Sequence, residues 1–168
     1  MPTLGKNVEY ALHSLVYLVG VPKGSTVTIR DLAKFQNISE SYLAKVFTKL
    51  KKGKIVRSNI GVKGGYSLGK LPSEITFLDV VLAVEGELSF FECKGIRDQC
   101  VILDQANLPW KKGEYCTIHL VMKETENKIK DTLREKNLEW LHDKVYSQTS
   151  PKLIADTINW FQTNVFKD

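Results

Sequence analysis

Apolar residues recur at helical spacing along three stretches near the start of the chain, at residues 6–20, 29–35 and 39–52. Thr28 and Ser39 have side chains that commonly cap helix N-termini, and they stand at the start of the second and third stretches. Only a short turn separates these two stretches. The pattern predicts a helix-turn-helix whose last helix buries one face and exposes the other.

A hairpin is predicted directly after this unit. Residues 55–58 and 66–68 have the length and composition of two short strands. Gly61, Gly64 and Gly65 lie between them and allow the positive φ angles of a tight tip. A helix-turn-helix followed by such a hairpin has the layout of a winged helix.

The second half of the chain alternates between periodic and irregular stretches. Apolar spacing predicts a short helix at residues 73–85 and a long helix at 117–136, which carries an apolar seam. Ser150 and Pro151 start a last amphipathic helix. Residues 86–116 lack periodicity and contain all three cysteines, Cys93, Cys100 and Cys116.

These elements predict a mainly α-helical chain with a small β wing, in which a winged helix-turn-helix is followed by a long C-terminal dimerisation helix. We expect a DNA-binding domain at 1–85, a cysteine-containing sensor loop at 86–116, a dimerisation region at 117–146 and a helical extension at 147–168. The apolar seam has few obvious partners within the module, which favours dimerisation. The alternative is that the seam folds back on its own chain.

Charge is distributed unevenly along the chain. Residues 1–72 carry 12 Lys and Arg against 3 Asp and Glu, a balance of +9, whereas residues 73–168 carry 12 against 16, a balance of −4. Winged helices also serve as protein-docking modules, but a basic module of this kind favours a phosphate-bearing partner. We therefore expect double-stranded DNA as the partner. DNA presents two half-sites, so a homodimer is expected.

The candidate DNA contacts are polar or basic side chains at the start of the second helix, along the third helix and on the wing, together with a glycine at the wing tip. Short polar side chains near the start of a recognition helix reach base edges, and basic side chains reach phosphates. They are Thr28, Ser39, Ser41, Tyr42, Lys45, Lys49, Arg57, Gly61 and Lys63.

Composition excludes several other classes. The 168-residue chain is 43% apolar, but its longest apolar run is far too short to span a bilayer and no signal sequence opens it, so a cytoplasmic protein is expected. Three cysteines are too few, and odd in number, for a disulfide framework. No nucleotide-binding loop or nucleophile–base pair is recognisable, which argues against an enzyme.

Several motifs resemble the iron–sulfur regulator family that includes IscR, NsrR and RsrR. They are ISESYLAKVFTKLKKGKIVRS, GVKGGYSL and EITFLDVVLAVEG, and the resemblance covers residues 4–140. It implies a homodimeric winged-helix transcription regulator, with long C-terminal helices that cross in the dimer. It also implies a cysteine loop that holds a cluster or senses redox state.

Within this family the chain is most similar to the redox sensor RsrR. The similarity rests on NVEYALHSL at 7–15, FECKGIRDQC at 91–100 and EYCTIH at 114–119. It implies a [2Fe–2S] cluster shared between subunits, with the cysteines from one subunit and the other two ligands from the first helix of its partner. The implied ligands are Glu9, His13, Cys93 and Cys116.

The chemistry of the residues agrees with a cluster but leaves alternatives open. Thiolates are the usual cluster ligands and imidazole can replace them, while Glu9 and His13 are four residues apart and share one helix face. A second set, within one subunit, is Cys93, Cys100, Cys116 and His119. The same residues could hold zinc, or a cysteine pair could form a disulfide switch without a cluster. An iron–sulfur electron carrier is a remote alternative.

Overall fold

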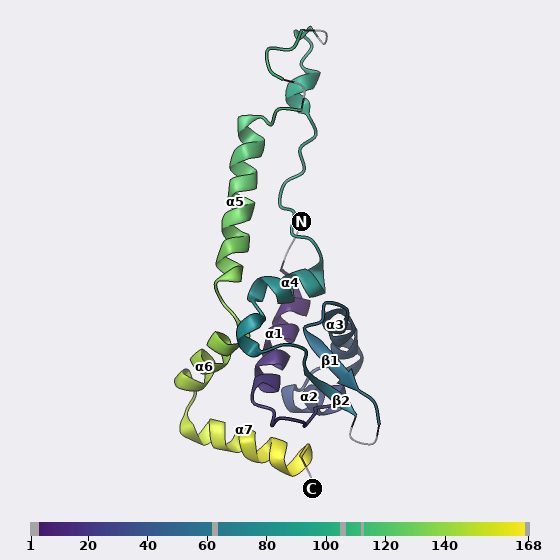
Figure 1. Ribbon diagram of the computed structural model, residues 1–168, viewed down its shortest axis with the longest axis vertical. Helices are drawn as coiled ribbons and strands as arrows, with labels where there is room; N and C mark the ends of the chain where they lie inside the picture. Colours follow the sequence, from purple (N-terminus) through teal and green to yellow (C-terminus); the bar gives the residue numbers. More distant parts are fainter. Residues whose placement is uncertain (1–3, 62–63, 105–106, 112, 167–168) are drawn as a thin grey trace.

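The computed structural model describes residues 4–61, 64–104, 107–111 and 113–166. The mainly helical fold with one small antiparallel wing is the one predicted (Figure 1). In chain order the elements are α1 (Lys6–Val19), α2 (Ile29–Gln36), α3 (Glu40–Lys52), β1 (Val56–Asn59), β2 (Gly65–Leu68), the 3-10 turn η1 (Pro72–Glu74), α4 (Phe77–Glu85), the 3-10 turn η2 (Ile96–Gln99), α5 (Thr117–Arg134), α6 (Leu138–Gln148) and α7 (Pro151–Asn164).

Side-chain caps start both helices of the helix-turn-helix, as predicted. The Thr28 hydroxyl accepts from the backbone N–H of Asp31 at 3.1 Å, and the Ser39 hydroxyl accepts from that of Tyr42 at 3.3 Å. Asn37 adopts a left-handed conformation with φ 53° and ends α2. The chain therefore reverses within a few residues and places α3 against α2.

The core lies where α1 meets α3 and α4. α1 packs against both of these helices and against α6. Each fully buried leucine or phenylalanine in this core stabilises the fold by about 1.5–3 kcal/mol. The fully buried large side chains of the core include Leu15, Leu32, Leu43, Phe47, Leu50, Ile75 and Leu138.

The first strand of the wing, β1, lies one residue later than predicted, whereas β2 begins one residue earlier, at Gly65. Ile55 still belongs to the turn that ends α3, because its N–H donates to the Leu50 carbonyl at 2.9 Å. The strands pair in register from Val56 opposite Leu68 to Asn59 opposite Gly65. A bridge between Val27 and β2 then ties the wing to the helix-turn-helix.

The predicted helix at residues 73–85 is wrong in its first turn. The structure has the short turn η1, an extended break at Ile75 and Thr76, and only then α4. The break exists because this backbone pairs with a distant segment: Phe77 N–H donates to the Lys136 carbonyl at 2.9 Å, and Leu138 N–H donates to the Ile75 carbonyl at 3.0 Å. Local periodicity carries no information about this pairing.

The same backbone bridge ends the long helix earlier than predicted. α5 stops at Arg134 instead of Lys136, and α6 follows after a short break. The apolar pattern does not predict α6, whose most buried residue is Leu138. Asn137 was the available signal, since its side chain accepts from the Trp140 N–H at 2.8 Å and caps α6.

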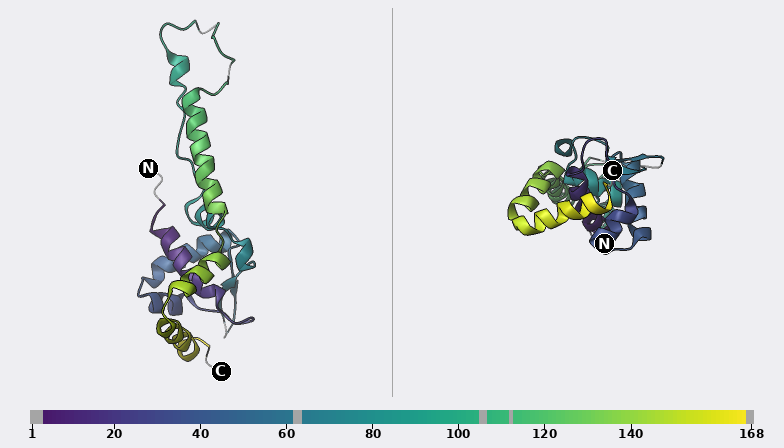
Figure 2. Two further views of the ribbon diagram at one scale, coloured as in Figure 1. Left: turned by 90° about the vertical axis from the view of Figure 1, so that its left-hand side faces the viewer. Right: turned by 90° about the horizontal axis from the view of Figure 1, so that it is seen from below.

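α5 and the segment that leads into the cysteine loop form a long arm away from the core (Figures 1 and 2). Glu126, which is only 4% exposed, joins the two sides of the arm. Its carboxylate accepts from the Phe90 backbone N–H at 3.3 Å and from the ammonium groups of Lys123 and Lys130, each at 2.9 Å. The lysine contacts lower the pKa of Glu126 to about 2.

α7 is the predicted tail helix, and an aromatic cluster holds it against α1 and α2. Ser150 caps it, accepting from the Leu153 N–H at 3.3 Å, and Pro151 is its first residue. The ring centroid of Phe35 lies 4.8 Å from that of Trp160 and 4.9 Å from that of Phe161. Figure 2 shows α7 crossing the end of the molecule opposite the arm.

Replacing Glu126 by Gln is expected to lower the free energy of unfolding by about 1–2 kcal/mol at pH 7, because charge-assisted hydrogen bonds are lost. Since folding depresses the Glu126 pKa from 4.5 to about 2, the carboxylate contributes fully above pH 4.5 and progressively less as the pH falls toward 2. Urea denaturation from pH 7 to 3.5 should therefore show a gap between wild type and variant that narrows with acid.

The matched control for this experiment is Glu124→Gln on the same helix. Glu124 is 65% exposed, and within the described residues Lys128 is its one ion-pair partner, so its removal should leave the denaturation midpoint nearly unchanged at every pH. A gap for Glu126→Gln that stays constant with pH would contradict the assigned pKa.

Candidate DNA interface and cysteine loop

The exposed face of α3 carries the polar side chains expected of a recognition helix. Ser41 and Lys45 are exposed, whereas Leu43 and Val46 on the opposite face are buried. The hydroxyls of Ser39 and Ser41 lie 3.0 Å apart at the start of the helix. Figure 1 shows the wing beside α3, so both elements can contribute to one surface.

The wing supplies one described basic side chain to this surface. Arg57 is exposed, and its Nε donates to the Ser67 hydroxyl on the paired strand at 3.0 Å. Gly61 has φ 123° at the start of the tip, a conformation that favours glycine. Lys63, also predicted to contact DNA, lies outside the described residues.

Three other predicted contacts have partners inside the protein. The Thr28 hydroxyl donates to the Asp31 carboxylate at 2.6 Å, which belongs to the α2 cap. Tyr42 donates from its hydroxyl to the Asn7 side chain at 2.8 Å. The Lys49 ammonium donates to the Val84 carbonyl at 2.6 Å, at the end of α4. Tyr42 and Lys49 therefore hold α3 in place, and no local sequence pattern indicates their partners.

Glu9 and His13 lie on the exposed face of α1, opposite the buried Ala11 and Leu15. Within the described part of the chain, neither side chain has a hydrogen-bond or ion-pair partner. The cysteine loop of the same chain lies at the far end of the arm (Figures 1 and 2). A single chain therefore does not bring these two side chains to its own cysteines.

All three cysteines have free thiols. Cys93 and Cys100 are exposed, whereas Cys116 is half-buried at the N-terminus of α5. The sulfur of Cys116 accepts from the backbone N–H of His119 at 3.5 Å and so caps α5.

His119 is the unusual residue near this cysteine. Its ring stacks on Tyr115 with the centroids 4.0 Å apart and packs edge-on to Phe91. The Nδ1 atom is buried and has no hydrogen-bond partner among the residues that the structure describes. An unsatisfied buried nitrogen costs free energy, so an additional partner for the imidazole would stabilise this arrangement.

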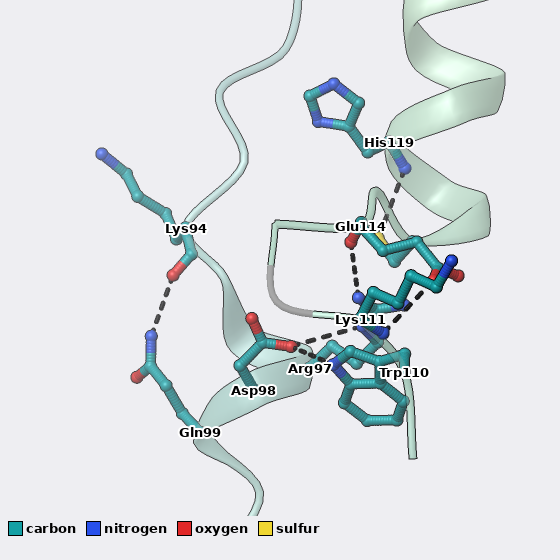
Figure 3. Close-up of polar contacts among 9 residues, drawn as sticks. Lys94, Arg97, Asp98, Gln99, Trp110, Lys111, Glu114 and His119 are labelled. Atoms are coloured by element: carbon teal, nitrogen blue, oxygen red, sulfur yellow. Dashed lines mark hydrogen bonds and ion pairs between the residues drawn. The ribbon is translucent and has the colours of Figure 1, made fainter. Parts of the chain in front are cut away.

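A polar cluster that no sequence pattern predicts shapes the middle of the loop (Figure 3). Asp98 accepts from the indole N–H of Trp110 at 2.9 Å and from Arg97 Nε at 3.3 Å. The Arg97 guanidinium lies 4.1 Å from the centroid of the Trp110 ring and also donates to the Glu114 carbonyl at 2.6 Å. Because residues 86–116 have no periodicity, only the presence of Arg, Asp and Trp hinted at this cluster.

Neither predicted ligand set is assembled in the structure of one chain. Among the described residues, no three His, Cys, Asp or Glu side chains are close enough together to hold a metal ion. The chemistry of the donors nevertheless suits a cluster, because free thiols and an imidazole with an unsatisfied nitrogen lie in or beside one loop. None of the helices in the described ranges is both long enough and apolar enough to cross a membrane.

Comparison with known proteins identifies the family. The family model Rrf2, described as an iron-dependent transcriptional regulator, matches residues 4–144. The HTH-type transcriptional regulator IscR of Photorhabdus laumondii subsp. laumondii is 30% identical over 133 residues, which cover 79% of this chain and 74% of IscR. Such relatives are transcription regulators and not enzymes.

Two solved structures share the fold. CymR (YrzC), the global cysteine regulator of B. subtilis, superposes with a TM-score of 0.65 at 23% identity, covering 86% of this chain and 98% of CymR. T. potens IscR superposes with a TM-score of 0.62 at 20% identity, covering 87% of this chain and 90% of that protein. The match of the family model over most of the chain, together with the IscR relative, shows that this protein belongs to the Rrf2 family of transcription regulators.

Proposed function

We propose that this protein is a cytoplasmic homodimeric regulator whose affinity for a DNA operator is controlled by the redox state or the presence of a [2Fe–2S] cluster. The observation that carries the proposal is the pairing of two features in one Rrf2 chain. One is the exposed polar face of α3 beside the wing, and the other is the loop with three free thiols at the end of the arm. The four sequence segments keep their proposed roles. α5 lies inside 117–146, and α6 begins inside that range and ends at Gln148.

On the DNA side, the exposed side chains divide into two roles. Ser39 and Ser41 lie at the N-terminus of α3, where short hydroxyl side chains can reach base edges. Lys45 and Arg57 are exposed at positions suited to phosphates. Tyr42 and Lys49 are already engaged with Asn7 and Val84, so they contribute by orienting α3.

The dimer is inferred from the arm. Ile118, Leu120 and Val121 on α5 are 67%, 54% and 54% exposed, although they are large apolar residues. Large exposed apolar residues gathered on one helix are typical of a protein–protein interface. A second copy of the chain would cover these residues and bring α1 of one subunit near the loop of the other, which the single chain does not do.

The ligand set that we favour takes Cys93 and Cys116 from one loop and Glu9 and His13 from α1 of the partner subunit. This is the arrangement that the similarity to RsrR implies, and the exposure of both α1 side chains agrees with it. His119 is the competing imidazole, supported by its unsatisfied Nδ1 beside Cys116. A cluster held by either set would supply a one-electron change of oxidation state.

A direct contact links α1 to the recognition helix. The side chain of Asn7, two residues from Glu9, accepts a hydrogen bond from the hydroxyl of Tyr42 on α3. The Tyr10 ring packs edge-on to the Tyr42 ring, with the centroids 5.1 Å apart. A displacement of α1 at Glu9 and His13 would therefore move the N-terminal turn of α3. That turn carries Ser41, so a change at the ligands becomes a change at the DNA surface.

Two other regulators on the same scaffold are distinguishable from this one. A zinc site would use the same thiols without a reducible signal, and a disulfide switch would need no metal. An electron carrier is the third possibility, but it gives no reason for an exposed basic face on α3 and the wing.

Replacing Lys45 by Ala should weaken binding to operator and to unrelated DNA alike and reduce the slope of log K against log salt by about 1, because one phosphate contact is lost. Fluorescence anisotropy across a salt series measures both quantities. Lys144→Ala on α6 is the control, since Lys144 is exposed but lies outside the proposed surface. Equal salt slopes for the two variants would show that Lys45 does not contact the DNA.

The ligand set is tested by anaerobic purification of Glu9→Ala, His13→Ala, Cys93→Ala, Cys100→Ala, Cys116→Ala and His119→Ala, with iron and sulfide content and EPR after dithionite. We expect a reducible [2Fe–2S] signal that requires the four residues of the favoured set and survives loss of Cys100 and His119. A signal that ignores α1 but needs Cys100 and His119 would place the site within one subunit. Absence of iron in the wild type would reject cluster control and leave the thiol or zinc switch.

The link between α1 and α3 is tested by Tyr42→Phe, which removes the hydrogen bond to Asn7 and keeps the ring. We expect the ratio of operator affinities in the two oxidation states to fall by at least threefold. Tyr10→Phe is the matched control, because the Tyr10 hydroxyl has no hydrogen-bond partner among the described residues. An unchanged ratio for Tyr42→Phe would show that the signal reaches α3 by another route.

A further inference from the structure

A cavity of about 130 Å³ lies between α1, α2, α6 and α7, on the side of the molecule away from the arm. Tyr17 and Phe35 form its inner wall, Tyr146 its side, and Leu153 and Ile154 its outer wall. Among the described residues, no charged side chain lines it. A binding function for this space is separate from the cysteine loop and from the DNA surface.

Four polar side chains are among the residues that line this largely apolar cavity: Tyr17, Tyr146, Thr149 and Thr157. The hydroxyls of Tyr17 and Tyr146 make no hydrogen bond with any described residue. Burial raises the pKa of both phenols, and the neighbouring Tyr146 raises that of Tyr17 further. Both hydroxyls are therefore protonated at neutral pH and free to donate or accept a hydrogen bond.

The walls are held apart by packing beyond the cavity. The C-terminal half of α7 is anchored because Phe161 is 7% exposed and its ring lies 4.9 Å from that of Phe35 and 5.9 Å from that of Tyr17, measured between centroids. The N-terminal half of α7, with Leu153 and Ile154, closes the outer side. An anchored helix cannot simply collapse onto α1 and fill the space.

We propose that this cavity binds a small uncharged aromatic molecule with one hydroxyl, carbonyl or amino group, of about the size of phenol. An apolar cavity of about 150 Å³ in another protein accommodates benzene, so the volume suits a single ring. The polar group of the ligand would pair with the hydroxyl of Tyr17 or Tyr146. A carboxylate is excluded, because a buried charge without a partner is costly.

The position of the cavity gives the ligand a route to the helix-turn-helix. Phe35 belongs to α2, which packs against the recognition helix α3. A shift of α7 against Phe35 would therefore change the position of α2 and, through it, that of α3. An effect of the ligand on DNA affinity rests on the DNA surface proposed above, whereas binding of the ligand to the cavity does not. Residues 145–157, which supply the outer wall, lie beyond the stretch that the family model matches.

The test is titration of the full-length protein with phenol, benzene and benzoate, followed by NMR chemical shifts and calorimetry. Wild type should bind phenol most tightly, benzene more weakly, and benzoate not at all. Thr157→Phe places a ring into the cavity and should weaken phenol binding by at least tenfold. Thr163→Phe, the same change at an exposed position of α7 that does not line the cavity, should leave it unchanged.

A second variant keeps the proposal testable if Thr157→Phe destabilises the fold, which thermal melting would reveal. Tyr146→Phe should retain benzene binding and lose at least threefold of the preference for phenol. Absence of phenol binding to the wild type, or binding that a folded Thr157→Phe variant leaves intact, overturns the proposal.

The effect on DNA is measured separately, as operator affinity with and without saturating phenol. A shift of threefold or more that Thr157→Phe abolishes supports an effector role. Phenol binding without such a shift leaves the site established and rejects the coupling. If the protein bound no DNA at all, the proposed function would be contradicted. The cavity proposal would still stand, because phenol binding is measured without DNA.

Discussion

The pairing of two short extended segments, at 75–77 and 136–138, is the constraint on which the architecture depends. Two backbone hydrogen bonds, Phe77 N–H to Lys136 O and Leu138 N–H to Ile75 O, join positions that are far apart in the chain. The chain between them, from α4 through the cysteine loop to α5, leaves the core and returns to it at the same place. The bridge therefore sets both the root of the arm and the start of α6 against α1.

The same constraint explains how far the sequence could predict the fold. Thr28, Ser39 and Ser150 cap their helices as expected, because a cap is decided by residues within one turn. The break at Ile75 and Thr76 could not be predicted, because a partner some sixty residues away imposes it. α6 could not be predicted from apolar periodicity, because Leu138 is its one buried residue and the rest of the helix is at least partly exposed.

In the candidate sites, too, local features could be predicted from the sequence and long-range contacts could not. The exposure of Ser41 and Lys45 follows from the 3.6-residue period, so the sequence was sufficient. The partners of Tyr42 and Lys49 are Asn7 and Val84, each 35 residues distant, and periodicity does not encode such contacts. As a result, α1 is more than a core helix, since it carries exposed Glu9 and His13 on one face and contacts the recognition helix through Asn7 and Tyr10.

The length of the arm has a consequence for the behaviour of the protein in a cell. Because the cysteine loop cannot reach α1 of its own chain, a site that uses both exists only while two chains are associated. Occupancy of such a site then depends on the square of the free protein concentration as well as on the supply of iron. A regulator with a site shared in this way would lose its complete ligand set when dilution separates the two chains, whatever the supply of iron.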